Sequence, residues 1–311
     1  MGFAMADDVL IYSLSEHRDL IFALLEAAAP SSVVEIGSEA GGMTREMCRW
    51  ASAGGGRSFT AVEPFPVVEV RELAAGTPSV TLVEGRSPEA LASVAAGDAW
   101  LIDGDHNYWT VTRELEAIYA GGRAPLAVLH DVGWPCGRRD QYYAVDALPA
   151  DAVHPHSFSR GRAPGSSELV ERGFGGGGEF AVALEEGGPR NGVLTAVEDF
   201  LASRDGLEYA HVPAVFGLGV IWSRDAPYAA AVADLLRPWD RNPLLARLEE
   251  NRMRLYMRVL EQQDRLGRAD PASNLVLLRY AERLADLEAE NASLRLERGH
   301  LRAAVDAAPS A

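Results

Sequence analysis

The chain of 311 residues has a formal net charge of -16, with 48% hydrophobic and 24% charged residues, which are ordinary globular values. The acidic balance argues against a protein that reads nucleic-acid backbones, because such proteins cluster Lys and Arg against phosphate. Two cysteines cannot form a disulfide framework, so we expect a reducing, cytoplasmic location. No apolar run approaches the roughly 18 residues of a membrane span, and the first residues lack the pattern of a signal peptide.

Residues 16–131 alternate short apolar runs with helical patterns. Strands are predicted at residues 33–36, 58–63, 80–84, 99–102 and 126–130, with helices between them, for example at 44–53 and 111–119. Strands that alternate with helices are typical of βαβ units and a parallel sheet. The strands are continuous Val, Ile and Leu runs, as expected when both faces of a sheet are covered. The sequence therefore predicts an α/β fold with a Rossmann-like, doubly wound and mostly parallel sheet.

The first predicted strand leads into a glycine-rich turn at residues 37–42. Glycine adopts positive φ and lets a ligand approach the backbone closely. A dinucleotide fingerprint would need another glycine where Glu39 stands. A pyrophosphate would also meet the carboxylates of Glu35 and Glu39. The turn therefore favours a ligand with little phosphate, such as one that carries a sulfonium or ammonium cation.

Two further strand ends follow in the order that a nucleoside cofactor needs. The second predicted strand ends at Glu63, whose carboxylate can accept both hydroxyl protons of a ribose diol. The third ends near Gly85 and Ser87, where a turn could contact an adenine. Together these elements resemble the cofactor half of class I S-adenosylmethionine-dependent methyltransferases, over residues 33–222. The resemblance implies that the cofactor contacts Glu35, Gly37, Ser38, Gly41, Glu63, Gly85, Ser87 and Asp103.

Acidic residues and histidines follow the fourth and fifth predicted strands. Residues 102–115 read IDGDHNYWTVTREL, and residues 129–132 read LHDV. Ligands bind at the carboxyl ends of parallel strands, so we expect these side chains to converge at one edge of the sheet. The side chains concerned are Asp103, Asp105, His106, His130 and Asp131. Repulsion between the carboxylates costs free energy unless a cation or a proton lies among them. The alternative is that Asp105 or Asn107 only caps the following helix.

These two segments resemble a metal-dependent branch of the class I fold. That branch includes macrocin-type sugar O-methyltransferases and the rhamnosyl O-methyltransferase/cephalosporin-hydroxylase-like group. The resemblance implies a divalent metal, Mg²⁺ or Mn²⁺, on Asp103, His130 and Asp131, with Asp105, His106 or His130 as the general base. His130 stands where the branch has an acidic residue. Magnesium prefers oxygen ligands, whereas imidazole suits manganese, iron, nickel or zinc better.

Residues 133–178 form an insertion rich in Gly, Pro, Arg and His, without a clear period. The composition predicts a long irregular loop, which is often a lid over a substrate. Arg138 and Arg139 would either bind an anionic substrate or balance the local acidic field. After the insertion we expect a strand at 180–184 and a helix at 193–203. Strands at 208–212 and 215–222 would then close the sheet with an antiparallel edge.

Residues 238–311 carry apolar residues at helical spacing, and between residues 277 and 305 they follow a heptad seam that includes Asn291. The pattern predicts a coiled-coil extension that holds a homo-oligomer together. The alternative is a solvated helix that folds back on the body. We therefore expect a methyltransferase domain over residues 1–237 and a helical extension over 238–311.

The combined reading is a cytoplasmic S-adenosylmethionine-dependent O-methyltransferase with divalent-metal assistance. Its expected substrate is a small molecule, a glycoside or another secondary metabolite of natural-product biosynthesis, with no nucleic-acid or membrane partner. Three alternatives remain open. They are an N-methyltransferase, a metal-dependent hydrolase or oxygenase that uses the Asp/His cluster without S-adenosylmethionine, and a non-catalytic coiled-coil scaffold.

Overall fold

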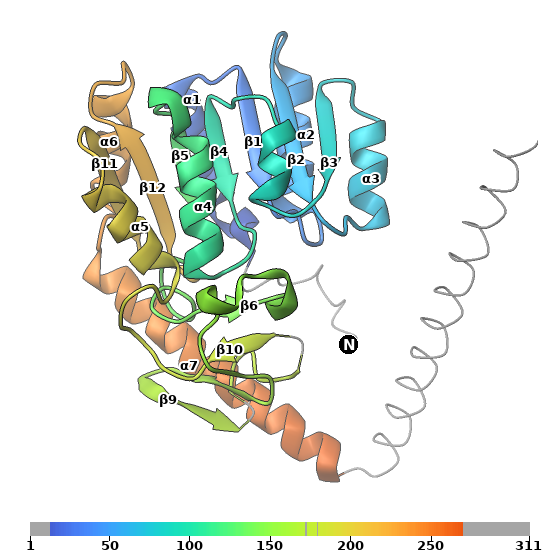
Figure 1. The fold of residues 1–311 in the computed structure, drawn as a ribbon, viewed down its shortest axis with the longest axis vertical. Coiled ribbons are helices and arrows are strands. Elements are labelled where there is room, and N and C mark those ends of the chain that lie inside the picture. The colour runs from blue at the N-terminus through green and yellow to red at the C-terminus, as the bar shows by residue number, and fades with distance from the viewer. Residues whose placement is uncertain (1–12, 172, 179, 270–311) are drawn as a thin grey trace, which may run out of the picture. The chain divides into compact units, whose positions relative to one another are not determined.

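The computed structural model describes residues 13–171, 173–178 and 180–269 (Figure 1). The chain divides into two compact units between Arg254 and Leu255, and the sheet belongs to the first of them. Helix α7 (Pro243–Ala269) crosses that division. The heptad seam at 277–305 lies outside the described residues, so the coiled coil and the boundary at residue 237 stay predictions. No helix in the described ranges is long and apolar enough to cross a membrane.

The first unit is built on a seven-stranded sheet with the order β11-β12-β5-β4-β1-β2-β3 (Figure 1). The strands are β1 (Ser32–Ile36), β2 (Ser58–Glu63), β3 (Val80–Glu84), β4 (Ala99–Ile102), β5 (Leu126–Leu129), β11 (Leu207–Val212) and β12 (Leu218–Ser223). Strands β1 to β5 pair in parallel, whereas β12 is antiparallel to both β5 and β11. The predicted Rossmann-like sheet is confirmed. The chain adds β2 and β3 on one side of β1 and then β4 and β5 on the other side. Folds of this kind bind ligands at the point where the strand order changes side, here between β1 and β4.

Helices cover both faces of this sheet and form a hydrophobic core on each. Neighbouring residues of one strand therefore pack in different cores. The elements that position the site are the 3-10 helix η1 (Leu14–His17) and the α-helices α1 (Arg18–Ala28), α2 (Gly42–Ala53), α4 (Tyr108–Ile118), α5 (Val193–Ala202) and α6 (Ala229–Leu236). Val33 packs with residues of α1, α2 and α6, whereas Val34 packs with residues of α4 and α5. Side chains alternate between the two faces of a strand, and here both faces are buried, which explains the continuous apolar runs.

The insertion at 133–178 is not the irregular loop that its composition predicts. It contains β6 (Gln141–Tyr142) and β7 (His156–Ser157), which pair with β10 (Ala181–Ala183), and the hairpin of β8 (Arg160–Ala163) and β9 (Ser166–Glu171). The strand predicted at 180–184 forms as β10 but joins this small sheet instead of the central one. Strands of two to six residues in a stretch rich in Gly and Arg leave little alternation to recognise, so the pattern could not reveal them.

A buried carboxylate ties the insertion to the central domain. Asp140 is fully buried, and its Oδ1 accepts hydrogen bonds of 2.7 Å from the backbone N–H groups of Tyr108 and Gly192. Its Oδ2 accepts a 2.9 Å hydrogen bond from the hydroxyl of Tyr142. The N–H of Gln141 donates to the carbonyl oxygen of His106, 3.0 Å away. These contacts fix β6 against the loop that follows β4.

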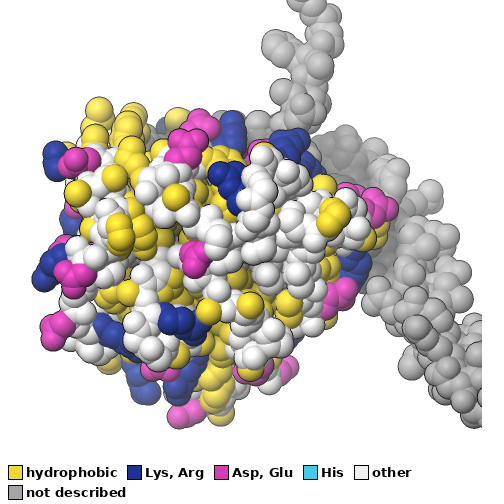
Figure 2. All heavy atoms as spheres, turned by 90° about the horizontal axis from the view of Figure 1, so that it is seen from above, with side chains coloured by type: hydrophobic (Ala, Val, Ile, Leu, Met, Phe, Trp, Pro, Cys, Tyr) yellow, Lys and Arg dark blue, Asp and Glu magenta, His cyan; other side chains and the backbone are white. Residues whose placement is uncertain are grey.

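Acidic and basic side chains are intermingled on the face that Figure 2 shows, which is seen from above the view of Figure 1. Arg71 with Glu84 and Arg113 with Glu116 are exposed ion pairs, both at 2.8 Å. Exposed ion pairs of this kind add little to stability. Two acidic side chains, Asp103 and Asp131, lie close together with His130 at the ends of β4 and β5.

Candidate functional site

The glycine turn after β1 is shaped by a close approach of two strand ends. Gly37 has φ +84°, and a Cβ at this position would lie 2.1 Å from the carbonyl oxygen of Asp103. Its N–H donates to the carbonyl oxygen of Val62, 2.9 Å away. Gly41, with φ +78°, precedes the first residue of α2. Only glycine fits at Gly37, because any side chain would collide with the end of β4.

Glu63 holds its carboxylate beside this turn. Its Oε2 accepts hydrogen bonds from the N–H of Ser38 at 2.9 Å and from the Ser38 hydroxyl at 3.4 Å. Its Oε1 accepts a 3.0 Å hydrogen bond from the N–H of Phe65. The carboxylate at the end of β2 is therefore oriented before any ligand binds, as the ribose reading requires.

Glu35 lies beneath the turn and not on its rim. The side chain is 1% exposed, and the hydroxyl of Thr44 on α2 donates to its Oε2 at 2.5 Å. Burial raises the pKa of Glu35 to about 8, and repulsion from Asp103 adds to this shift. The structure therefore places Glu35 as an uncharged acid that anchors the first turn of α2. The sequence pattern could not tell whether Glu35 lies on the rim of the turn or beneath it.

Ser87 leads to a buried acid that the sequence reading missed. Its hydroxyl donates a hydrogen bond to Oε1 of Glu114 on α4. Glu114 is fully buried, and within the described part of the chain its Oε2 has no hydrogen-bond partner. Burial raises the pKa of Glu114 to about 8. The side chain is therefore a neutral acid at physiological pH, packed against the end of β4 near Gly104.

Replacing Glu114 by Gln is expected to make stability less dependent on pH. Between the usual pKa of 4.5 and about 8, the native state keeps a proton that the unfolded state releases. The free energy of unfolding therefore falls as pH rises through this window, by about 1.4 kcal/mol per pH unit for this group. Gln cannot ionise and removes that loss. Urea unfolding of wild type and variant at pH 5 and pH 8 measures the difference.

The control for this prediction is Glu116→Gln, on the same helix, where Glu116 forms an exposed pair with Arg113. This variant should lose as much stability between pH 5 and pH 8 as the wild type. An equal loss in Glu114→Gln would contradict the buried, protonated state of Glu114.

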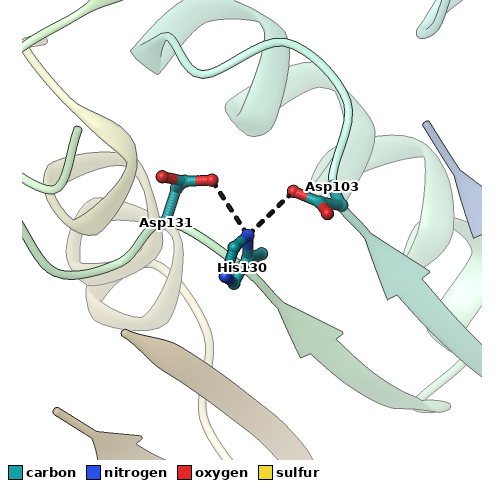
Figure 3. Close-up of side chains that lie close together, drawn as sticks. All are labelled: Asp103, His130 and Asp131. Carbon is teal, nitrogen blue, oxygen red and sulfur yellow. Dashed lines mark hydrogen bonds and ion pairs between the residues drawn. The ribbon is translucent and has the colours of Figure 1, made fainter. Parts of the chain in front are cut away.

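Three side chains meet where β4 and β5 end (Figure 3). The Nδ1 of His130 lies 3.0 Å from Oδ1 of Asp103 and 3.1 Å from Oδ2 of Asp131. Their potential ligand atoms all lie within 4.8 Å of one another. His130 and Asp131 are buried, and Asp103 is half-buried. Asp131 has φ +59°, a left-handed conformation that Asp tolerates better than most residues and that is frequent at functional sites.

The hydrogen bond of the other ring nitrogen of His130, Nε2, decides that Nδ1 is the nitrogen that faces the two aspartates. Its Nε2 lies 2.8 Å from the carbonyl oxygen of Val215, which can only accept, so Nε2 carries a hydrogen. Burial disfavours the charged ring, but the carboxylates of Asp103 and Asp131 outweigh it and raise the pKa of His130 well above its usual value. Without a metal, an imidazolium therefore balances the two acids.

The same arrangement fits a divalent cation. Metal-bound histidines usually donate their second ring N–H to a carbonyl or carboxylate, as Nε2 does here to Val215. A cation would then take the place of the Nδ1 proton, with one oxygen from each aspartate beside it. One nitrogen with two carboxylate oxygens suits manganese, iron or zinc better than magnesium.

His106 and Asp105 complete the cluster that the sequence predicts. The Nδ1 of His106 lies 3.4 Å from Oδ2 of Asp131, and its Nε2 lies 3.4 Å from the hydroxyl of Tyr143. The Oδ1 of Asp105 accepts hydrogen bonds from the backbone N–H groups of His106 and Tyr143 at 3.1 and 3.2 Å. Burial raises the pKa of Asp105 to about 6. The capping alternative also occurs, but through Asn107, whose side chain accepts from the N–H of Thr110.

Sequence reasoning missed two residues at the site, Val215 and His17. Tyr143 is half exposed, and its ring meets Phe180 edge to face with centroids 4.8 Å apart. Val215 supplies the carbonyl to His130. His17, from η1, is buried with its ring centroid 6.0 Å from that of His130. No motif marks His17 or Val215, because their roles depend on which loops the fold brings together.

The arginines of the insertion have protein partners. Arg138 forms a bidentate pair with Glu198, with distances of 2.6 and 2.7 Å. Arg139 is 1% exposed and donates to the carbonyl oxygens of Ala183 and Leu184 at 2.8 and 2.7 Å. The contact of Arg138 with Glu198 agrees with the local-balance alternative, whereas Arg139 is held by backbone carbonyl groups. An anionic substrate stays a prediction without these residues to support it.

Residues 34–123 match a family model described as a methyltransferase domain. The chain is similar to the structure of a proposed O-methyltransferase from Klebsiella pneumoniae, with 18% identity, 70% of this chain and 82% of that chain covered, and a TM-score of 0.41. It is also similar to the O-methyltransferase TomG from Streptomyces achromogenes in complex with S-adenosylmethionine, with 13% identity, coverage of 71% and 92%, and a TM-score of 0.39. No curated protein matches the sequence.

Proposed function

We propose that the chain, whose residues 34–123 match a methyltransferase domain, uses S-adenosylmethionine to methylate a hydroxyl group of a small molecule with the help of a divalent cation. The observation that carries this proposal is His130, whose Nδ1 faces Asp103 and Asp131 while its Nε2 is held by Val215. A hydroxyl acceptor must lose a proton on methylation, and the cluster offers both acid–base groups and a cation site. A neutral amine attacks through its free lone pair, so an amine acceptor would need neither a general base nor a cation.

The cofactor half of the site supports binding of S-adenosylmethionine. Glu63, already oriented by Ser38, would accept the two hydroxyl protons of the ribose. The turn at Gly37 packs directly against the end of β4, which brings it close to Asp103. The carboxylates of Asp103 and Glu39 would favour the positive sulfonium.

Glu63→Gln is expected to weaken binding of S-adenosylhomocysteine by about 10-fold to 100-fold, because hydrogen bonds to a charged acceptor contribute about 1.5–3 kcal/mol. Isothermal titration calorimetry measures this loss directly. The matched control is Glu84→Gln, because Glu84 ends the neighbouring strand in register with Glu63 and pairs with Arg71 on the surface. Equal affinities in wild type and Glu63→Gln would contradict the ribose assignment.

The acceptor side of the proposal assigns His106 as the general base. Its Nδ1 faces the carboxylate of Asp131, so its Nε2 is left to accept a proton. His130 is less suited to this task, because both of its ring nitrogens already face acceptors. A divalent cation bound here would lower the pKa of a substrate hydroxyl and orient it. Asp105 would hold the loop that presents His106.

An aromatic surface beside His106 supports a ring-shaped acceptor. Tyr143 is half exposed next to Phe180, and its hydroxyl lies 3.4 Å from Nε2 of His106. A substrate hydroxyl beside the Tyr143 hydroxyl would therefore lie close to the proposed base. Aromatic faces combine apolar area with a polar edge, which suits a glycoside or a phenolic secondary metabolite. The cytoplasmic location and the homo-oligomer through residues 238–311 belong to the same proposal.

The test is methyl transfer from labelled S-adenosylmethionine to a panel of phenols, glycosides and amines by metal-stripped protein. We expect O-methylated product when Mn²⁺ is restored and none with a chelator. N-methylated product would favour the amine alternative, and full activity with a chelator would remove the cation from the proposal. The cofactor half counts against a hydrolase or oxygenase, and methyl transfer to any acceptor would exclude a pure scaffold.

A further inference from the structure

The turn between β11 and β12 has a costly backbone conformation. Val215, Phe216 and Gly217 have φ values of +43°, +63° and +88° in succession. The left-handed region is unfavourable for any residue with a Cβ, and for a β-branched residue such as Val215 it is a genuine outlier. Such strain persists only where the surrounding structure enforces it, and it is frequent at functional sites.

Contacts from two other elements enforce this conformation. The N–H of Phe216 donates to Oε1 of Glu249 on α7, 3.0 Å away. The carbonyl oxygen of Phe216 accepts from the N–H of Gly133, just beyond β5, at 2.6 Å. Arg252 pairs with Glu249 at 2.6 Å, and its guanidinium lies 5.5 Å from the centroid of the Phe216 ring. The turn is therefore clamped between α7 and the loop that carries the cluster.

The strained turn delivers one group to the cluster, the carbonyl oxygen of Val215. This oxygen lies 2.8 Å from Nε2 of His130 and 3.5 Å from Nε2 of His17. It decides which nitrogen of His130 carries the fixed hydrogen and which one faces Asp103 and Asp131. A partner that fixes the second nitrogen sets both the tautomer and the orientation of a metal-bound histidine.

We propose that the Val215–Gly217 turn, clamped by Glu249, positions His130 for the cation site. Val215 and Glu249 are positioning residues, since neither belongs to the candidate ligand set of Asp103, His130 and Asp131. The inference rests on the proposed function, because it requires a cation at Asp103, His130 and Asp131. It adds that α7, far along the chain from β4 and β5, controls the geometry of the site.

The test compares Co²⁺ affinity and the visible spectrum of bound Co²⁺ in three variants of the full chain. Val215→Gly relaxes the turn, and Glu249→Ala removes the acceptor for the Phe216 N–H. Glu250→Ala is the matched control, because among the described residues the adjacent Glu250 forms ion pairs with Arg247 and Arg254 along α7. We expect Co²⁺ binding to weaken by about 10-fold to 100-fold in the first two variants, with an altered spectrum, and to be unchanged in the control.

Thermal unfolding separates this role from a merely structural one. Glycine adopts φ +43° without a Cβ clash, so Val215→Gly should unfold at the same or a higher temperature than the wild type. Loss of affinity without loss of stability supports positioning. If wild type and Val215→Gly bind Co²⁺ equally while Asp131→Asn does not bind it, the inference is overturned and the cation site stands. If the wild type itself binds no Co²⁺, the cation site and the inference fail together.

Discussion

His106→Asn is expected to lower kcat for methyl transfer by about 10²-fold to 10⁴-fold, the range that a positioned general base contributes. Asn keeps a donor near Oδ2 of Asp131, where Nδ1 of His106 lies at 3.4 Å, but removes Nε2. Because His106 does not hold the cofactor in this account, the affinity for S-adenosylhomocysteine should stay within a few fold of wild type. Steady-state kinetics on the first acceptor found, together with calorimetry, separates these two quantities.

The control for this prediction is His156→Asn. His156 belongs to β7 of the small sheet, and its Nδ1 contacts the carbonyl oxygen of His154. We expect near wild-type kcat in this variant. A near wild-type kcat in His106→Asn as well would contradict its assignment as base and would return that role to Asp105 or His130.

Asp131→Asn is expected to weaken Mn²⁺ binding by at least about 100-fold, because it removes one of two negative charges beside the cation. The backbone at φ +59° tolerates Asn as well as Asp, so the variant should keep its fold. The same change removes a carboxylate that faces both His106 and His130, so kcat should fall with it. Electron paramagnetic resonance of Mn²⁺ titrated into metal-stripped protein counts the bound ions.

Asp146→Asn serves as the matched control, since Asp146 is an exposed aspartate in the insertion, outside the cluster. Its Mn²⁺ binding should equal that of wild type. Undiminished Mn²⁺ binding by Asp131→Asn would place the ion elsewhere, and the cluster would then be an ion-paired triad with an imidazolium at its centre.

The sequence predicted the central sheet and the meeting of Asp103, His130 and Asp131 because both follow from one physical rule. Parallel strands buried on both faces give unbroken apolar runs, and their carboxyl ends share one edge. Residues that follow neighbouring strands must then be neighbours in space, however far apart they lie in the chain. The metal-dependent resemblance added the chemistry to that placement.

Other features could not be predicted, because they depend on contacts between distant loops. The apolar run at 215–222 predicted a strand, but Val215 and Phe216 form the left-handed turn and β12 begins at Leu218. The hydrophobicity of a residue indicates that it is buried, but it does not indicate the φ angle of its backbone. The small sheet is stabilised by buried polar contacts such as those of Asp140, so its sequence looks like a loop. Glu35 and Glu114 look like ordinary acids until the packing around them is known.

The most direct test of the account is an anomalous diffraction map from crystals grown with Mn²⁺ and S-adenosylhomocysteine. We predict a manganese peak bonded to Nδ1 of His130 and to one oxygen each of Asp103 and Asp131, with Nε2 of His130 still held by Val215. The ribose should lie on Glu63, and Nδ1 of His106 should still face Asp131. A map without a peak at this position, in which His130 still donates to both aspartates, would contradict metal-assisted methyl transfer by this cluster.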